Sequence, residues 1–125
     1  MKCFACFQRI AIDSSVVHFD DYSLWWLDAL RSLTCYDCCL YKAPDISYVC
    51  KTLETLNLQE NYIDFLPFDY FVNCTILRSV SLTSNLLEVF PNMKTLSSFI
   101  TRIRIARNQL VDTQNFFQNY YTKLR

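Results

Sequence analysis

The chain has 125 residues, 52% of them hydrophobic, which suits one domain with a core of its own. Twelve basic and twelve acidic side chains cancel, so the overall charge gives no indication of a nucleic acid or an anionic membrane as partner. The chain has no glycine and one histidine, which excludes recognisable phosphate-binding loops and leaves catalytic triads and histidine zinc sites poorly supplied. We therefore expect a protein that is not an enzyme and that needs neither a cofactor nor a metal.

The first ten residues, MKCFACFQRI, lack the apolar core of a signal peptide, because Gln8 and Arg9 end the apolar stretch. No apolar run approaches the roughly 18 residues that a membrane-spanning helix needs. The sequence as it stands predicts no membrane span and no route to secretion. Only six residues precede the first repeat described below, too few for a capping unit. We therefore expect a segment of a longer array, or a chain that lacks its first exon.

A spacing of apolar residues followed by one polar residue recurs along the chain. In the third copy it is formed by Leu53, Leu56, Leu58, Asn61 and Ile63. The same spacing starts near residues 7, 30, 53, 77 and 100, which makes five copies at intervals of 23 or 24 residues. The prolines support this register independently, since each lies fourteen residues after the first position of its own copy: Pro44, Pro67 and Pro91. The repeat therefore covers most of the chain.

Each copy predicts one short strand and one corner. Apolar residues at the fourth and sixth positions, with a polar residue between them, are typical of a strand with one buried face. Stacked copies pair such strands into a parallel sheet with a spacing of about 4.8 Å. At the ninth position asparagine suits a corner, because it tolerates unusual backbone angles and hydrogen-bonds the backbone of a turn. The predicted corner residues are Ser15, Cys38, Asn61, Asn85 and Asn108.

The segments LETLNLQENYIDFLP (residues 53–67) and LRSVSLTSNLLEVFP (77–91) match the motif of leucine-rich repeats closely. LRSLTCYDCCLYKAP (30–44) matches the variant of that motif with cysteine in place of asparagine. Over residues 7–110 the chain resembles the leucine-rich repeat family. The resemblance implies an α/β solenoid of about five repeats, a single domain over residues 1–125. It would have a short curved parallel sheet on its concave face and an irregular or helical convex side.

Residues 111–125 are expected to form a short amphipathic helix that caps the last repeat. The prolines after the corners and the run FVNCTILRSV are similar to repeats of extracellular receptors and adhesion proteins. The resemblance implies a fragment of a recognition or innate-immune receptor ectodomain, at the cell surface or outside the cell. The alternative is a cytoplasmic scaffold or adaptor that keeps its cysteines reduced.

The chain has seven cysteines, and one interpretation is that some of them bind zinc. The pairs Cys3–Cys6 and Cys35–Cys38 have the spacing of a zinc ribbon. The repeat register contradicts it, because Cys35 and Cys38 take the core and corner positions of their copy. Cys3 and Cys6 precede the first strand. We therefore predict no metal.

Cys50 and Cys74 each stand three residues before the start of a copy. Equivalent positions in neighbouring coils lie about one strand spacing apart, which is within reach of a disulfide. The alternative is that both are buried free thiols, the commonest role of unpaired cysteine, and the odd total of cysteines favours it. Asn73 begins a glycosylation triplet, Asn-Cys-Thr, of the kind that chance alone produces about once in such a chain.

Binding in solenoids usually takes place on the concave sheet, through side chains that alternate with the buried leucines. This predicts a protein or glycan ligand, and no nucleic acid, since no aromatic residue accompanies the basic cluster. Charge along this face runs from Asp13, Asp37 and Glu60 to an arginine cluster, a separation that would orient a polar partner. The alternative is that a solvated sheet face simply needs polar residues. The predicted ligand-binding residues are Tyr36, Asp37, Asn57, Gln59, Glu60, Thr83, Arg102, Arg104 and Arg107.

Overall fold

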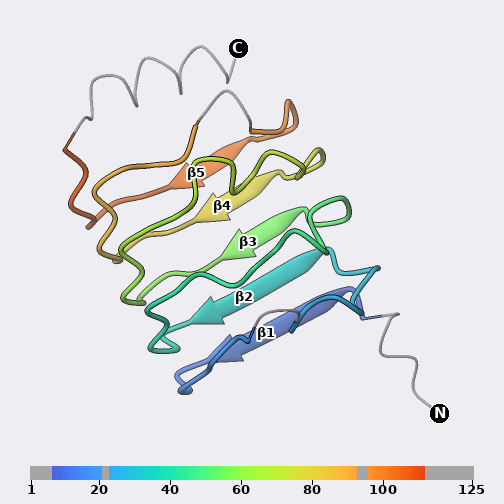
Figure 1. Ribbon diagram of the computed structural model, residues 1–125, viewed down its shortest axis with the longest axis horizontal. Coiled ribbons are helices and arrows are strands. Elements are labelled where there is room, and N and C mark those ends of the chain that lie inside the picture. Colours follow the sequence, from blue (N-terminus) through green and yellow to red (C-terminus); the bar gives the residue numbers. More distant parts are fainter. Residues whose placement is uncertain (1–6, 21–22, 93–95, 112–125) are drawn as a thin grey trace.

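The alternation of apolar and polar residues in each copy forms one short parallel strand per coil. A computed structural model describes residues 7–20, 23–92 and 96–111. Its five parallel strands stack in chain order into one sheet, and the chain returns between them around a β-solenoid (Figure 1). The strands are β1 (Arg9–Asp13), β2 (Ser32–Tyr36), β3 (Thr55–Asn57), β4 (Ser79–Ser81) and β5 (Arg102–Arg104).

The strand register confirms the predicted repeat. Ile10 pairs with Leu33, Leu33 with Leu56, Leu56 with Val80, and Val80 with Ile103. All five are the fourth residue of their copies, so one repeat corresponds to one coil.

The core lies between the sheet and the return segments. Leu33, Leu56 and Val80 on the three inner strands are completely buried, as are Leu30, Leu53 and Leu77 at the starts of their coils. Ile10 on β1 and Ile103 on β5 are only half-buried, because each has a neighbouring coil among the described residues on one side alone. The inner coils therefore supply most of the hydrophobic stabilisation.

The corner asparagines form a ladder of side-chain hydrogen bonds along the stack. Asn61 Oδ1 accepts from the backbone N–H groups of Cys38 and Leu40, both at 3.0 Å. Asn61 Nδ2 donates to the carbonyl of Cys35 in the preceding coil at 2.8 Å. Asn85 and Asn108 repeat part of this arrangement one and two coils further on: each Oδ1 accepts from one backbone N–H of the preceding coil, and each Nδ2 donates to a carbonyl of that coil. These side chains pair buried backbone groups that the turn would otherwise leave without partners.

The two predicted corners without asparagine behave differently. Cys38 is buried, and its thiol donates weakly to the carbonyls of Ile12 and Tyr36, at 3.5 and 3.2 Å. These acceptors correspond to two that Asn61 Nδ2 uses in the next coil. Ser15 is exposed, and its hydroxyl donates to the carbonyl of Asp13 in its own coil.

The residue before each corner has a left-handed backbone. Its φ lies between 51° and 59° in all five coils, at Ser14, Asp37, Glu60, Ser84 and Arg107. Glycine is the usual residue for this conformation, and the chain has none. The side chains at these positions are therefore held by a strained backbone.

The convex side was predicted to be irregular or helical, and the described return segments are irregular. In the second return, Val49 N donates to Ile46 O and Thr52 N donates to Val49 O, so consecutive three-residue turns replace a helix. The residues that the structure describes contain no helix, and the α/β class is not confirmed. For the same reason that part of the chain has no helix able to cross a membrane. The predicted capping helix falls outside the described residues, apart from Val111.

Candidate functional site

Strand pairing arranges the outward side chains into two ladders across the sheet. In one ladder the small residues of β2, β3 and β4 stand between an arginine at each end: Arg9, Ser32, Thr55, Ser79 and Arg102. The other ladder is Ala11, Thr34, Asn57, Ser81 and Arg104. We call the surface formed by these ten residues the outer sheet face. Short hydroxyl and amide side chains occupy its centre, so a ligand can approach the strands closely there.

The structure places Arg102 and Arg104 together on this face, because alternate residues of β5 point the same way. Arg107 lies after the strand, at the left-handed position before the corner residue Asn108. All three arginines are exposed. No carboxylate stands beside them in the two ladders. This arginine group is therefore available to an acidic or hydrogen-bond-accepting partner.

Asn57 belongs to the second ladder, and the other predicted residues lie beside the ladders, where the strands end. Asp37 N donates to Gln59 O at 3.1 Å and Glu60 N donates to Thr83 O at 3.0 Å, so these residues form a further row across the coils. Asp37 and Glu60 are exposed, and Gln59 and Thr83 are half-buried. Tyr36 is exposed at the end of β2, while Asn57 is half-buried on β3. The acidic residues and the arginine group thus occupy different coils of one surface.

Sequence reasoning did not include Arg9 among the binding residues. It is exposed on β1 and opens the ladder that Arg102 closes. The charge on this surface is therefore not a simple gradient from acidic to basic. The repeat register would have identified Arg9, since it holds the same position in its copy as Arg102.

Two hydroxyls near the arginine group have no hydrogen-bond partner among the described residues. They are the side-chain oxygens of Ser81 and Ser84. Ser81 is only 6% exposed although its strand position faces outward, and the register places it next to Arg104. Both oxygens are themselves shielded from solvent, so in this conformation neither can contact a ligand.

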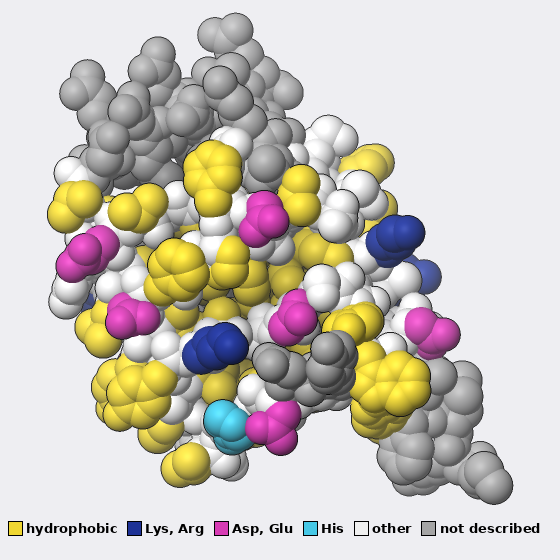
Figure 2. Space-filling model, viewed as in Figure 1, with side chains coloured by type: hydrophobic (Ala, Val, Ile, Leu, Met, Phe, Trp, Pro, Cys, Tyr) yellow, Lys and Arg dark blue, Asp and Glu magenta, His cyan; other side chains and the backbone are white. Residues whose placement is uncertain are grey.

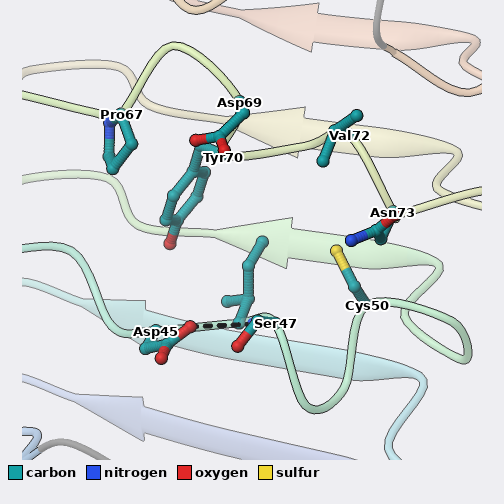
Figure 3. A pocket seen from close by; sticks show the side chains of 9 residues that line it. Asp45, Ser47, Cys50, Pro67, Asp69, Tyr70, Val72 and Asn73 are labelled. Carbon is teal, nitrogen blue, oxygen red and sulfur yellow. Dashed lines mark hydrogen bonds between the residues drawn. The ribbon is translucent and has the colours of Figure 1, made fainter.

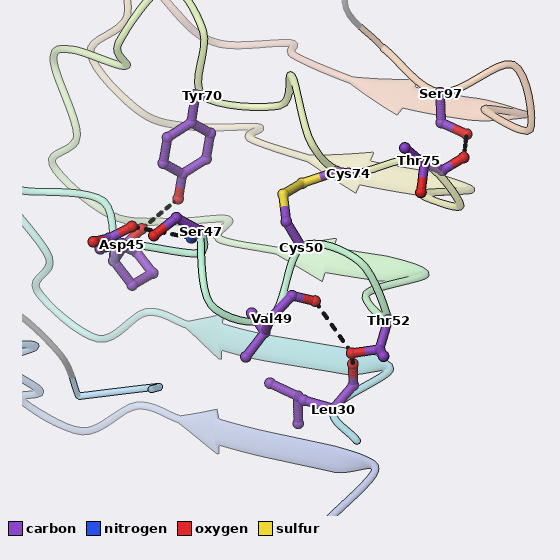
Figure 4. The surroundings of a disulfide bond; sticks show 11 residues. Leu30, Asp45, Ser47, Val49, Cys50, Thr52, Tyr70, Cys74, Thr75 and Ser97 are labelled. Atoms are coloured by element: carbon purple, nitrogen blue, oxygen red, sulfur yellow. Dashed lines mark hydrogen bonds between the residues drawn. A yellow bond between two sulfur atoms is a disulfide. The ribbon is translucent and has the colours of Figure 1, made fainter. Parts of the chain in front are cut away.

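Two of the described cysteines, Cys50 and Cys74, have a structural role. A disulfide joins Cys50 to Cys74, whose Cα atoms lie 4.3 Å apart, and ties the second return segment to the third (Figure 4). Of the two alternatives, a disulfide and a pair of free thiols, the structure has the disulfide. Close to the disulfide, a hydrogen bond joins the second return segment to the first: the Thr52 hydroxyl donates to the carbonyl of Leu30 at 2.7 Å.

Cys35 and Cys38 are buried free thiols on the strand and at the corner of the second coil. Burial raises the pKa of the Cys35 thiol to about 12, and the neighbouring Cys38 adds to the shift. Burial also raises the pKa of Cys38, against the lowering effect of the backbone N–H of Ser15. Both thiols stay protonated near neutral pH, which makes them poor nucleophiles and poor metal ligands. The described residues contain no group of three or more metal-ligating side chains, and Cys3 and Cys6 lie outside them.

A small cavity of about 170 Å³ lies beside the disulfide, between the second and third return segments (Figure 3). Asp45, Asp69, Tyr70 and Asn73 contribute polar groups to its wall. Asn73 is exposed, so its amide is open to solvent as glycosylation would require. Asp45 Oδ1 accepts from Ser47 N at 3.0 Å, which fixes the loop on one side.

No protein-family model matches this sequence, and no curated protein is significantly similar to it.

Proposed function

We propose that the chain is a leucine-rich repeat segment that binds a protein ligand on its outer sheet face and catalyses no reaction. The arginine group formed by Arg102, Arg104 and Arg107 carries the proposal. Arg102 and Arg104 extend from β5 in a stack of paired strands, and Arg107 follows that strand. Arginine forms paired hydrogen bonds with carboxylates, so this part of the face suits an acidic segment of the ligand.

The repeat itself supports the family assignment. The corner asparagines share one hydrogen-bonding role in successive coils, and the strand pairing follows the spacing of the leucine-rich motif. A surface built from short strands presents side chains at fixed positions, so a ligand orders few groups when it binds. That property suits a recognition module, of the receptor or adhesion kind.

Selection of displayed random peptides on the immobilised protein would test this function. We expect acidic peptides to be enriched, and the double variant Arg102→Ala, Arg104→Ala to weaken their binding at least tenfold. Lys51→Ala is the control, since Lys51 is an exposed cation outside the outer sheet face. Selected peptides that bind the double variant as well as the wild type would overturn the proposal. A parallel glycan array distinguishes an acidic glycan ligand from a protein.

The disulfide supports an extracellular or cell-surface location over the cytoplasmic scaffold. Disulfides persist in oxidising compartments and are rare in the cytosol. The chain has seven cysteines, so the Cys50–Cys74 bond leaves five thiols at most. Thiol counting on denatured protein from its natural source decides between the two: five or fewer thiols support the receptor alternative, and seven support the scaffold.

A further inference from the structure

The return segments carry a second candidate binding surface, separate from the outer sheet face, which combines exposed hydrophobic and acidic side chains. Hydrophobic side chains gather on the face shown in Figure 2, with acidic side chains distributed among them. Three adjoining cavities open along the four return segments. The first is the cavity of about 170 Å³ beside the disulfide, and the second, of about 340 Å³, shares Asp45, Pro67 and Tyr70 with it. The third, of about 290 Å³, shares Phe65 with the second. We call this surface the acidic groove.

Exposed aromatic and aliphatic side chains line the acidic groove. Phe65 is 69% exposed, Phe68 70% and Val89 68%. Phe65 and Val89 hold the same position in the third and fourth coils. The equivalent residues of the first two coils are Phe19, which is half-buried against the core, and Lys42. Large side chains as open as Phe65, Phe68 and Val89 lie beyond what packing of the core requires, and a group of them marks an interaction surface.

The charge of the acidic groove contrasts with the neutral chain. Its lining includes five of the twelve acidic residues of the sequence but one of the twelve basic ones, Lys42. The acidic residues are Asp20, Asp45, Asp64, Asp69 and Glu88. The groove thus has an excess of negative charge beside exposed phenyl rings. Arginine and lysine suit both features, since they pair with carboxylates and stack on aromatic faces.

The floor of the acidic groove is rigid. Tyr70 donates its hydroxyl to the carbonyl of Pro44 at 2.7 Å, which joins the second and third return segments. Burial and the nearby Asp45 raise the pKa of the Tyr70 hydroxyl, so it remains a donor at physiological pH. The disulfide between Cys50 and Cys74 ties the same two segments together. A preformed floor lowers the cost of ordering the site on binding.

We propose that the acidic groove binds a basic segment of a partner protein, one in which lysine or arginine alternates with apolar residues. The basic side chains would pair with Asp64 and Glu88 on the third and fourth coils, and the apolar ones would cover Phe65 and Phe68. This site is separate from the arginine group on the outer sheet face and takes a ligand of opposite charge.

Fluorescence anisotropy with a labelled ten-residue peptide of alternating arginine and leucine tests the proposal. We expect micromolar binding that weakens at high salt, because the contacts are partly electrostatic. The double variant Asp64→Lys, Glu88→Lys should lose at least tenfold in affinity. The control Asp13→Lys, Asp28→Lys changes the net charge equally at exposed positions outside the groove, and it should lose less than threefold. Equal losses in both variants would show binding to net charge alone and would overturn the proposal.

Phe65→Ser isolates the apolar contribution and should weaken the peptide about fivefold. A peptide in which serine replaces leucine should bind wild type and Phe65→Ser equally weakly. If circular dichroism shows that the lysine variants are unfolded, Asp64→Asn with Glu88→Gln replaces them, with the same direction of effect expected. Failure of the arginine–leucine peptide to bind wild type at millimolar concentration would also overturn the proposal. So would a peptide-independent dimer that Arg102→Ala, Arg104→Ala abolishes, since the chain's own arginine group would then be the occupant.

Discussion

The side-chain oxygen of Asn61 lies 3.0 Å from the backbone nitrogen of Cys38, the residue at the equivalent corner one coil earlier. Each corner asparagine therefore stabilises the turn of the preceding coil as well as its own. Asn61 also donates to Leu58 O in its own coil, and Asn85 donates to the same carbonyl from the next one. Asn61 and Asn85 thus link three coils through groups that are buried, which is where a lost hydrogen bond costs most.

Replacement of Asn61 by leucine should destabilise the protein by about 3 kcal/mol. The substitution leaves the buried backbone N–H groups of Cys38 and Leu40 without their acceptor, and each such loss costs on the order of 1–3 kcal/mol. Urea denaturation followed by circular dichroism measures the change. Asn73→Leu, at an exposed position, is the control and should change stability by less than about 0.5 kcal/mol. Equal stability of Asn61→Leu and wild type would mean that the ladder contributes nothing.

The sequence predicted the strands and corners because their residues are chosen by packing and hydrogen bonding that repeat in every coil. Leu56 must fill the same core position as Leu33 and Val80, so the spacing is visible without a structure. The return segments were harder to predict. Leu24, Leu27 and Leu30 recur every three residues, which fits one face of a helix as well as it fits consecutive turns. The structure has turns there, with Leu27 N donating to Leu24 O and Leu30 N to Leu27 O.

The left-handed positions were not predictable from residue type. Glu60 and Arg107 are unusual residues for positive φ, and only their shared place before a corner identifies them. The outer sheet face followed from strand alternation, whereas the acidic groove did not. Its members, such as Asp20, Asp64 and Glu88, come from return segments whose conformation the sequence left open. The one indication in the sequence was that Phe19 and Phe65 hold the same position in their copies of the repeat.

Glu60→Gly should stabilise the protein by up to about 1 kcal/mol. At a φ of 59° a side chain with a Cβ strains the backbone, and glycine removes that strain at the cost of a more flexible unfolded chain. Thermal and urea unfolding measure the effect. Gln59→Gly is the matched control one residue earlier, where φ is not positive, and it should destabilise by about 0.5–1 kcal/mol. A loss of stability in both variants would show that the corner carries no strain.

Removal of the disulfide should cost about 3 kcal/mol. The bond closes a loop with a sequence separation of 24 residues, and its loss lets the unfolded chain explore more conformations. The double variant Cys50→Ala, Cys74→Ala should unfold at a lower urea concentration than wild type. Reducing agent should destabilise wild type by a similar amount and leave the double variant unchanged. An effect of reducing agent on the double variant would indicate a different disulfide.

Stability should fall as the pH rises above about 9, and Cys35 should account for part of the fall. The ordinary pKa of a cysteine thiol is 9.0, and burial raises that of Cys35 to about 12 in the folded protein. Below pH 9 both states keep the proton, so the full stability is present. Between pH 9 and 12 the unfolded state loses the proton and the folded state keeps it. The free energy of unfolding then falls by about 1.4 kcal/mol per pH unit for this group.

Urea denaturation of wild type and Cys35→Ala at several pH values between 8 and 11 tests this, with short incubations that limit thiol–disulfide exchange. The alanine variant should be less stable at pH 8, because it leaves a cavity, and its stability should fall less steeply with pH. Leu33→Ala is the control, since Leu33 is equally buried on the same strand and cannot titrate. It should lower stability by a similar amount at every pH and keep the slope of wild type. The Cys38 thiol and the buried hydroxyl of Tyr70 have raised pKa values as well, and they add to the slope above pH 9 and pH 10, respectively, in all three proteins. An unchanged slope in Cys35→Ala would mean that the Cys35 thiol is as free to ionise in the folded protein as in the unfolded chain.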